Sequence, residues 1–309
     1  MAYPSLTKTF HKASYAAISP TRPELSLKGK TIVISGGGTG IGAEITQAFA
    51  EAGAARIAIL GRRTNVLEET KQKVGKSTDG KVAVSTHVTD VSDLASVQKA
   101  AEEIGKWDVL VSNAGYLPDI KHLVDSDPTD WWKAFEINVR GPFNLAHAFL
   151  PVRNANATLI GVSAGSIQVP FLAENWTAYN SSKFAAVKML QDLASELPDL
   201  HVVSMHPGVG MSKQSCHHSQ LVDDVLMTTI TVESAMSEKS FAGKAQAPQY
   251  DTVELPAHFA VWLCSQEARF LRGKFTWCNW DVEELIAKKD ELQGSLVATA
   301  NCIGWPYAP

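Results

Sequence analysis

The chain has 309 residues, of which 45% are hydrophobic and 19% are charged, and its formal net charge at pH 7 is −4. This composition supports a large buried core and argues against intrinsic disorder. The absence of a Lys and Arg cluster argues against a nucleic-acid partner, and the absence of an apolar run of about 18 residues argues against a membrane span. The four cysteines lack the spacing of a disulfide framework or a metal site, so free thiols in a cytoplasmic compartment and no bound metal are expected.

Short β-branched segments alternate with longer amphipathic segments along the chain. The predicted strands are 31–35, 56–60, 82–88, 109–112, 158–162, 201–205 and 274–278. The predicted helices are a segment ending near residue 52, then 66–74, 93–104, 130–150, 178–196 and 256–264. Because the strands are apolar nearly throughout, this alternation predicts an α/β fold with a single Rossmann-type, doubly wound parallel sheet of about seven strands and helices on both faces.

The expected organisation is a short arm followed by one domain. Residues 1–28 are predicted to form an irregular N-terminal arm, because its three prolines oppose regular structure. Residues 29–309 are predicted to form a single domain that ends in a tail from about residue 282. The polar stretch 211–250 has weak helical patterning and is interpreted as an inserted lid or binding loop.

A glycine-rich turn lies between the first predicted strand and the first predicted helix, where residues 35–42 read Ser-Gly-Gly-Gly-Thr-Gly-Ile-Gly. A glycine turn at the N-terminus of a helix lets backbone N–H groups approach and hold a pyrophosphate. A purely structural turn is the alternative, but the order of strand, glycines and helix favours nucleotide binding.

Further motifs follow in the order and spacing of a known family. They are Asp90-Val91, Ser112-Asn113-Ala114-Gly115, Ile137-Asn138-Val139, Tyr179 to Lys183 with the pattern Y-x-x-x-K, and Pro207-Gly208. With the G-x-x-x-G-x-G turn, these motifs resemble the short-chain dehydrogenase/reductase family over about residues 28–281. Segments 20–25 and 279–281 resemble fungal members in particular.

The resemblance implies an NADP-binding catalytic domain and a set of cofactor contacts. The residues that match those contacts are Gly36, Thr39, Gly40, Ile41, Gly42, Arg62, Arg63, Asp90, Val91, Asn113, Ala114, Gly115, Tyr179, Lys183, Pro207, Gly208, Val209 and Ser212. It also implies a homodimer or homotetramer, because the helix that begins near Trp131-Trp132 often forms subunit contacts in the family. Core packing is an equally good interpretation of these tryptophans.

The end of the second predicted strand indicates which nicotinamide cofactor is used. NAD-binding folds place an acidic residue there to bind the ribose 2′-hydroxyl, whereas this chain has Arg62 and Arg63. Two guanidinium groups can bind a 2′-phosphate, so NADP(H) is predicted rather than NAD(H).

Tyr179 and Lys183 are the predicted centre of the chemistry, because residues four apart project from one face of a helix. A free tyrosine has a pKa of about 10, and a nearby ammonium is expected to lower it by roughly 3 units, into the range useful for acid–base work. By resemblance, Lys183 also binds the nicotinamide ribose, and Asn138 holds a water that links Lys183 to solvent.

By resemblance, a serine at the end of the fifth strand polarises the substrate oxygen. Three residues compete for this position: Ser163, which is preferred by the strand alignment, Ser166 by its spacing from Tyr179, and Ala164 if the alignment slides by one residue. Ala164 in that position would weaken or replace redox activity.

The function expected is the interconversion of a ketone or aldehyde and an alcohol on a medium-sized hydrophobic molecule. Family analogy alone suggests that this molecule belongs to secondary metabolism. The apolar residues of segment 169–176, which include Trp176, are interpreted as a wall for that substrate. Two alternatives stay open: a family member that binds NADP(H) but catalyses a cyclisation or isomerisation, and a non-catalytic nucleotide-binding protein.

Overall fold

The computed structural model describes residues 5–168, 175–208 and 251–301. In these residues the chain forms a parallel sheet of seven strands in the order β3-β2-β1-β4-β5-β6-β7. The strands are β1 Thr31–Ser35, β2 Arg56–Gly61, β3 Ala83–Val88, β4 Trp107–Ser112, β5 Arg153–Val162, β6 His201–His206 and β7 Phe275–Trp277. The predicted fold class is therefore confirmed.

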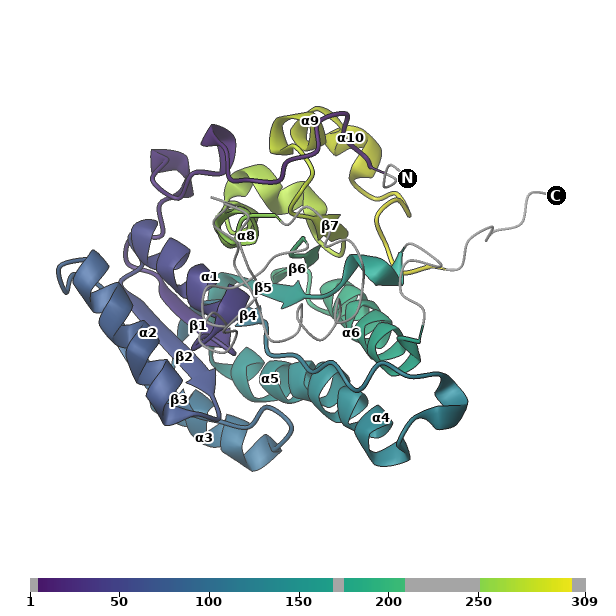
Figure 1. The fold of residues 1–309 in the computed structure, drawn as a ribbon. Coiled ribbons are helices and arrows are strands. Elements are labelled where there is room, and N and C mark those ends of the chain that lie inside the picture. Colours follow the sequence, from purple (N-terminus) through teal and green to yellow (C-terminus); the bar gives the residue numbers. More distant parts are fainter. Residues whose placement is uncertain (1–4, 169–174, 209–250, 302–309) are drawn as a thin grey trace, which may run out of the picture.

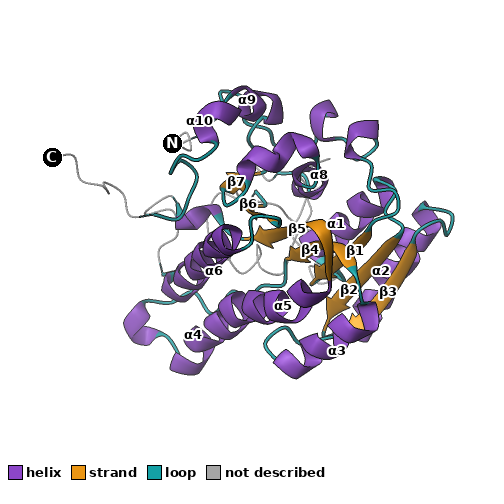
Figure 2. Cartoon of the chain, turned by 180° about the vertical axis from the view of Figure 1, so that it is seen from behind, coloured by secondary structure: helices purple, strands orange, loops and turns teal. Residues whose placement is uncertain are grey.

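Helices cover both faces of the sheet, as the two opposite views in Figures 1 and 2 show. The longer helices are α1 Gly40–Glu51, α2 Thr64–Ser77, α3 Leu94–Ile104, α4 Pro128–Phe135, α5 Gly141–Phe149, α6 Thr177–Glu196 and α8 Glu254–Leu263. One core packs α1 and α8 against the sheet through residues such as Phe49 and Trp262. A second core packs α3, α5 and α6 against the other face through residues such as Val97 and Phe149.

The order of the strands indicates where on the sheet a ligand would bind. From β1 the chain first moves outward to β2 and β3, and it then crosses back to β4 on the other side of β1. Ligands of doubly wound sheets bind at such a reversal, in the crevice beyond the carboxyl ends of the strands. The glycine turn after β1 and the segment after β4 both lie at this point.

The predicted long helix 130–150 is interrupted. It begins at Pro128, where the Asp127 carboxylate accepts hydrogen bonds from the N–H groups of Thr129 and Asp130. A π-helical turn, Glu136–Arg140, then separates α4 from α5. Periodicity did not reveal this turn, because it is judged over windows of about 11–18 residues, which are longer than a single wide turn.

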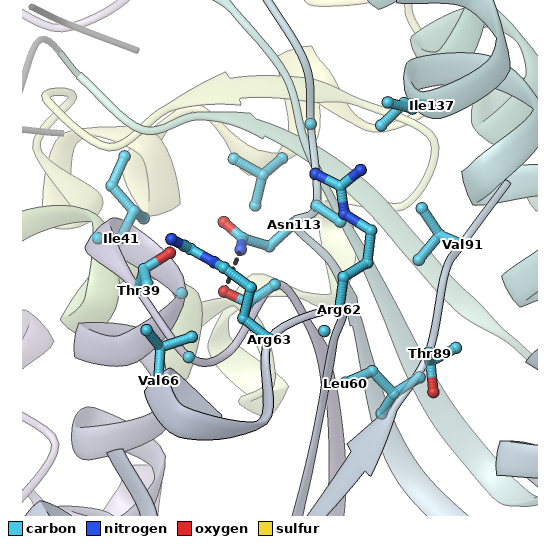
Figure 3. A pocket seen from close by; sticks show the side chains of 18 of the residues that line it. Thr39, Ile41, Leu60, Arg62, Arg63, Val66, Thr89, Val91, Asn113 and Ile137 are labelled. Carbon is cyan, nitrogen blue, oxygen red and sulfur yellow. Dashed lines mark hydrogen bonds between the residues drawn. The ribbon is translucent and has the colours of Figure 1, made fainter. Parts of the chain in front are cut away.

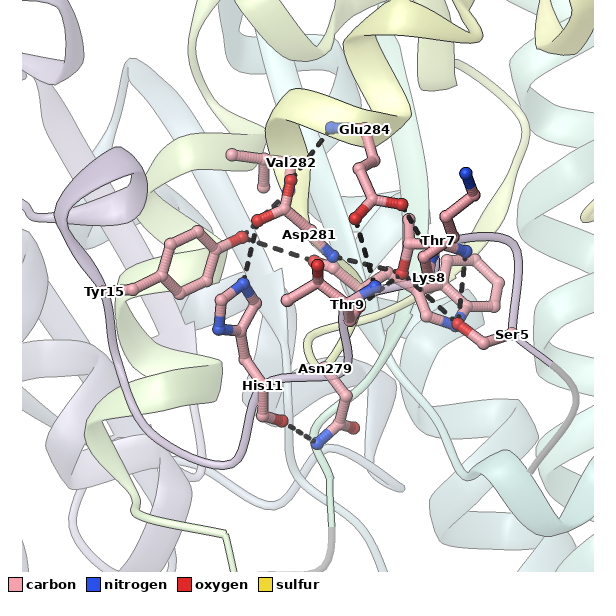
Figure 4. A network of polar contacts seen from close by, with 11 residues as sticks. Ser5, Thr7, Lys8, Thr9, His11, Tyr15, Asn279, Asp281, Val282 and Glu284 are labelled. Atoms are coloured by element: carbon pink, nitrogen blue, oxygen red, sulfur yellow. Dashed lines mark hydrogen bonds and ion pairs between the residues drawn. The ribbon is translucent and has the colours of Figure 1, made fainter. Parts of the chain in front are cut away.

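The N-terminal arm packs against the C-terminal part of the domain through a polar network (Figure 4). His11 forms an ion pair of 2.8 Å with Asp281, which also caps α9 Val282–Ala287 by accepting from the Glu284 N–H. The Glu284 carboxylate in turn accepts from the N–H groups of Lys8 and Thr9. The arm contains two short 3-10 turns, Ala16–Ile18 and Pro23–Leu25, so it is irregular in conformation but closely held.

The C-terminal tail continues through α10 Lys289–Leu292 and is fastened to β7. Lys274 donates from Nζ to the backbone carbonyls of Ser295 and Val297. Within the ranges that the structure describes, no helix is long and apolar enough to cross a membrane. The predicted insertion 211–250 lies outside the described residues, as do Val209 and Ser212.

Candidate functional site

The glycine turn has the geometry of a phosphate-binding loop. Gly36 has a φ of +67°, a conformation that side chains other than glycine rarely adopt. A Cβ at Gly42 would overlap the Gly36 carbonyl oxygen, so the backbone can curl over the N-terminus of α1 only without a side chain there. The free N–H groups and the dipole at this helix end favour an anion.

The turn is fastened to the end of β4. Asn113 donates from Nδ2 to the Ser35 carbonyl at 2.9 Å, and Ser35 Oγ accepts from the N–H groups of Asn113 and Ala114 at 3.0 and 3.1 Å. These bonds connect two segments that meet at the strand-order reversal. They hold the glycine loop and the start of the Asn113–Gly115 segment in one fixed arrangement.

A cleft of about 350 Å³ opens above these segments (Figure 3). Most of the predicted cofactor and catalytic residues line it: Gly36, Thr39, Gly40, Ile41, Gly42, Arg62, Arg63, Asp90, Val91, Asn113, Ala114, Gly115, Ser163, Tyr179, Lys183 and Pro207. Asn138 and Gly208 do not line it. Gly208 instead has a φ of +74° and packs closely on Asp251. A glycine is therefore needed at the turn that follows Pro207.

Arg62 and Arg63 reach into the cleft from the end of β2 (Figure 3). On the neighbouring strand end, Asp90 accepts hydrogen bonds from the Ser92 N–H and Oγ. Partial burial opposes ionisation of Asp90, but these two bonds and the positive charge of Arg62 lower its pKa. The lining of the cleft in this region therefore offers two cations beside one fully ionised carboxylate.

Tyr179 and Lys183 lie on one face of α6, and both side chains are buried. Lys183 donates from Nζ to the Val162 carbonyl at 3.0 Å, and this nitrogen lies 5.8 Å from the centre of the Tyr179 ring. Gly115 faces the same nitrogen, since a Cβ there would lie 3.1 Å from Nζ. The two groups thus converge at the inner end of the cleft.

The prediction that the Lys183 ammonium lowers the pKa of Tyr179 is wrong for the protein without a bound ligand. Burial raises the pKa of Tyr179 and lowers the pKa of Lys183 to about 8. Both shifts arise because desolvation penalises the charged form of each group. The ammonium is directed to the Val162 carbonyl, so it does not offset the desolvation of the phenol.

Asn138 lies behind the cleft in the π-helical turn and is 1% exposed. Its Oδ1 accepts from the Tyr116 N–H, and its Nδ2 donates to the Tyr116 carbonyl and to Ser182 Oγ. A small cavity of about 10 Å³ lies between Asn138, Lys183 and Ser163. That volume is near the minimum that holds one water molecule.

The three residues that compete for the serine position differ in their contacts. Ser163 lines the cleft, and its Oγ donates to the Lys183 carbonyl at 3.3 Å. Ser166 donates to Asn180 Oδ1 at 2.7 Å and is not among the residues that line the cleft. Ala164 packs against Tyr179 and Leu117.

Comparison with known proteins identifies this arrangement. A sequence model described as short chain dehydrogenase matches residues 30–216, which is more than half of the chain. A short chain dehydrogenase/reductase of Aspergillus aculeatus, AacuD, is 32% identical over 93% of this chain and 92% of its own length. A short chain dehydrogenase/reductase of Claviceps purpurea is 34% identical over 94% of this chain and 91% of its own length. The chain belongs to the short-chain dehydrogenase/reductase family.

The fold is also that of solved members of the short-chain dehydrogenase/reductase family. A short chain dehydrogenase structure from Shigella flexneri, complexed with NADP, has a TM-score of 0.68 and 24% identity, and it covers 83% of this chain and 99% of its own. One from Escherichia coli, complexed with NADPH, gives the same values. At this identity the similarity concerns the fold. The chain is thus an oxidoreductase of this family by sequence and a Rossmann-type member by structure.

Several residues of the cleft in this short-chain dehydrogenase/reductase were not predicted. They are Gly38, Leu60, Gly61, Val66, Leu67, Thr89, Ile137 and Val162. Most of them end a strand, directly follow one or lie in the first turn of a helix, and that position was the available signal. No metal was expected, and in the described ranges no group of three His, Cys, Asp or Glu side chains is placed to hold one.

Proposed function

We propose that this family member uses NADP(H) to interconvert a ketone or aldehyde and the corresponding alcohol on a medium-sized hydrophobic molecule. One observation carries the proposal: Tyr179 and Lys183 line the same cleft as the glycine turn. A dinucleotide bound over the glycines would supply or accept a hydride at the end of the cleft where these side chains lie.

The residues of the cleft fit an NADP molecule. Gly36 and Gly42 line the cleft, and the N-terminus of α1 beside them favours the charge of a pyrophosphate. Arg62 and Arg63 would hold the 2′-phosphate by charge-assisted hydrogen bonds. The NADP and NADPH complexes of two proteins with the same fold support this assignment.

Tyr179 would act on the substrate oxygen. In the reduction, a hydride would add to the carbonyl carbon, the C–O π electrons would move to oxygen, and this oxygen would take the phenolic proton of Tyr179. The phenol carries its proton at neutral pH, as an ordinary tyrosine does. Burial raises its pKa, which makes it a weaker acid in the protein by itself. The alcohol would leave, and the Tyr179 phenolate would regain its proton from Lys183.

Lys183 is suited to return that proton. Burial lowers its pKa to about 8, so at neutral pH it is charged but releases a proton readily. A water in the small cavity beside Asn138 would restore the proton from solvent. The π-helical turn explains how Asn138 comes to face this cavity instead of the helix surface.

The test is NADPH oxidation with a ketone panel that includes 2-tetralone and cyclohexanone. Tyr179→Phe keeps the ring and removes only the hydroxyl, so we expect kcat to fall by at least about 100-fold while NADPH binding is retained. Tyr15→Phe is the matched control, because it removes a partly buried phenolic hydroxyl from the arm. Equal activity of wild type and Tyr179→Phe contradicts the proposal.

One observation favours a second candidate function, a non-redox cyclisation or isomerisation. The residue of the β5 end that shares an apolar cluster with Tyr179 is Ala164, whose side chain carries no hydroxyl. Tight NADPH binding without NADPH oxidation by any ketone would favour this function or a non-catalytic nucleotide-binding role.

We also propose that the enzyme is a cytoplasmic homodimer or homotetramer. The aromatic side chains of Trp132, Phe143 and Phe184 are 57, 50 and 41% exposed on α4, α5 and α6. These helices lie together on one side of the molecule in both views (Figures 1 and 2). A second copy of the chain would bury this face, and the reduced Cys264 and Cys278 suit a reducing compartment.

A further inference from the structure

We infer that Ser163 is a positioning residue that holds Lys183, and that Ala164 occupies the place beside Tyr179 from which a second hydroxyl would reach the substrate oxygen. This inference rests on the proposed carbonyl chemistry at Tyr179. It implies that the substrate oxygen receives one hydroxyl donor, the phenol, and none from the end of β5.

The end of β5 and residue 183 are joined by two hydrogen bonds that run in opposite directions. Lys183 Nζ donates to the Val162 carbonyl at 3.0 Å, and Ser163 Oγ donates to the Lys183 carbonyl at 3.3 Å. The Ser163 N–H donates to Met205 on β6 at 2.8 Å, so the backbone of Ser163 is fixed by the sheet. The Ser163 hydroxyl is therefore directed to the backbone of α6 and braces the helix that carries Lys183.

Ala164 faces the other way. Successive residues of an extended segment point to opposite sides, and Ala164 has extended dihedral angles of −135° and 135°. Its methyl group packs with Leu117 and Tyr179 in a small apolar cluster. Trp176 adds an edge-on contact to the Tyr179 ring, with 5.5 Å between ring centres. The described surroundings of the ring are thus largely apolar, which agrees with the raised pKa of its phenol.

Ser166 is held away from the phenol. Its Oγ donates to Asn180 Oδ1 at 2.7 Å on α6. The preceding Gly165 is packed so closely that a Cβ there would lie 2.8 Å from both His206 and Trp277. This contact fixes the backbone of the turn, so Ser166 is not placed to replace the missing hydroxyl.

The consequence can be measured on turnover. A preorganised donor to the developing oxyanion changes kcat by about 100- to 1,000-fold in other enzymes. Ala164→Ser adds such a donor beside Tyr179, so we expect kcat for the best ketone of the panel to rise by at least about 10-fold. Ala164→Gly alters the same position without a hydroxyl and should give no rise.

Ser163 is tested by two variants. Ser163→Ala should lower kcat by no more than about 10-fold and shift the pH profile of kcat, because it loosens Lys183 without removing a group that touches the substrate. Ser163→Thr keeps the hydroxyl, so its kcat and the pH profile of its kcat should match those of the wild type. A fall of about 100-fold or more in Ser163→Ala with an unchanged pH profile, or no gain in Ala164→Ser, overturns the inference.

A second readout does not need turnover. Ionisation of Tyr179 is followed by ultraviolet difference spectroscopy, with Tyr179→Phe as the reference. Ala164→Ser should lower the pKa of Tyr179, because a hydroxyl donates to the phenolate, whereas Ser163→Ala should leave it unchanged. A rise in Ser163→Ala places the Ser163 hydroxyl on the phenol and overturns the inference. If none of the ketones supports NADPH oxidation by the wild type but these shifts appear, the proposed function fails. The placement of Ala164 beside Tyr179 and of Ser163 on Lys183 then stands, without a role in carbonyl chemistry.

Discussion

At the scale of single residues, the cleft combines a buried pair of ionisable side chains with an exposed pair of arginines. Tyr179 and Lys183 are desolvated at its inner end, where burial makes the phenol harder to deprotonate and the ammonium easier to deprotonate. Arg62 and Arg63 are exposed and line the cleft from the end of β2, and the charge of Arg62 acts on Asp90. The buried pair suits proton transfer, and the exposed pair suits the binding of a phosphate.

The exposed arginines make a prediction about cofactor preference. Charge-assisted hydrogen bonds to a phosphate contribute about 1.5–3 kcal/mol, so Arg62→Ala should raise the Kd for NADPH by about 10- to 100-fold and hardly change that for NADH. Fluorescence titration with both cofactors measures this. Arg56→Ala, at the exposed start of the same strand, serves as the control. A wild-type preference for NADH that persists in Arg62→Ala would refute the assignment.

At the scale of elements, the N-terminal arm is tied to the domain end by a chain of polar contacts. Asn279 Nδ2 donates to the His11 carbonyl at 2.8 Å and to Asp251 at 3.0 Å, and Asp251 packs on Gly208. The arm is thereby connected to the backbone that follows Pro207 at the cleft. An irregular segment is thus part of the folded unit through hydrogen bonds instead of secondary structure.

The His11–Asp281 ion pair should contribute stability that depends on pH. Burial opposes ionisation of Asp281, but its hydrogen bonds to His11 and to the cap of α9 lower its pKa below the usual value. A carboxylate with a depressed pKa stabilises the fold above its unfolded pKa of about 3.9, and this contribution is lost as the pH falls further. Asp281→Asn should therefore reduce the free energy of unfolding by about 1–2 kcal/mol at pH 6 and by much less at about pH 3.

Urea denaturation at both pH values measures this effect. Glu283→Gln is the matched control, because this neighbouring carboxylate is exposed and should change stability by less than about 0.5 kcal/mol. The same loss in Asp281→Asn at both pH values would show that the ion pair does not cause it.

At the scale of the whole molecule, two cores on opposite faces of one sheet leave an aromatic face on the outside. The exposed Trp132 stacks with Trp131 and Phe135, and Phe143 and Phe184 are exposed on α5 and α6. Exposed aromatic surface of this kind is costly for a monomer in water. Its burial by a second copy would relieve that cost.

The oligomer can be tested by light scattering after gel filtration. We expect the wild type to elute as a dimer or tetramer, and Trp132→Glu combined with Phe143→Glu to elute as a smaller species, because two buried charges oppose the contact. Leu296→Glu carries a new charge on an exposed residue of the tail and should leave the mass unchanged. A monomeric wild type would show that the face does not hold a second copy.

Much of the fold followed from local pattern. The strands and helices could be predicted because apolar periodicity and glycine turns are local properties, and the parallel sheet follows from their alternation. The family could be recognised from motifs such as the glycine turn and the Tyr179–Lys183 pair, and the sequence comparisons confirm it.

Only the tertiary structure decided what depends on solvation and on contacts between distant segments. The pKa directions of Tyr179 and Lys183 depend on burial, which spacing along a helix does not reveal. Likewise, the Ser163 hydroxyl is directed to the Lys183 carbonyl and the Ala164 methyl to Tyr179, because the end of β5 packs against a helix far along the chain. Residue types and their order are written in the sequence, but the direction of a hydroxyl depends on how strand and helix pack together.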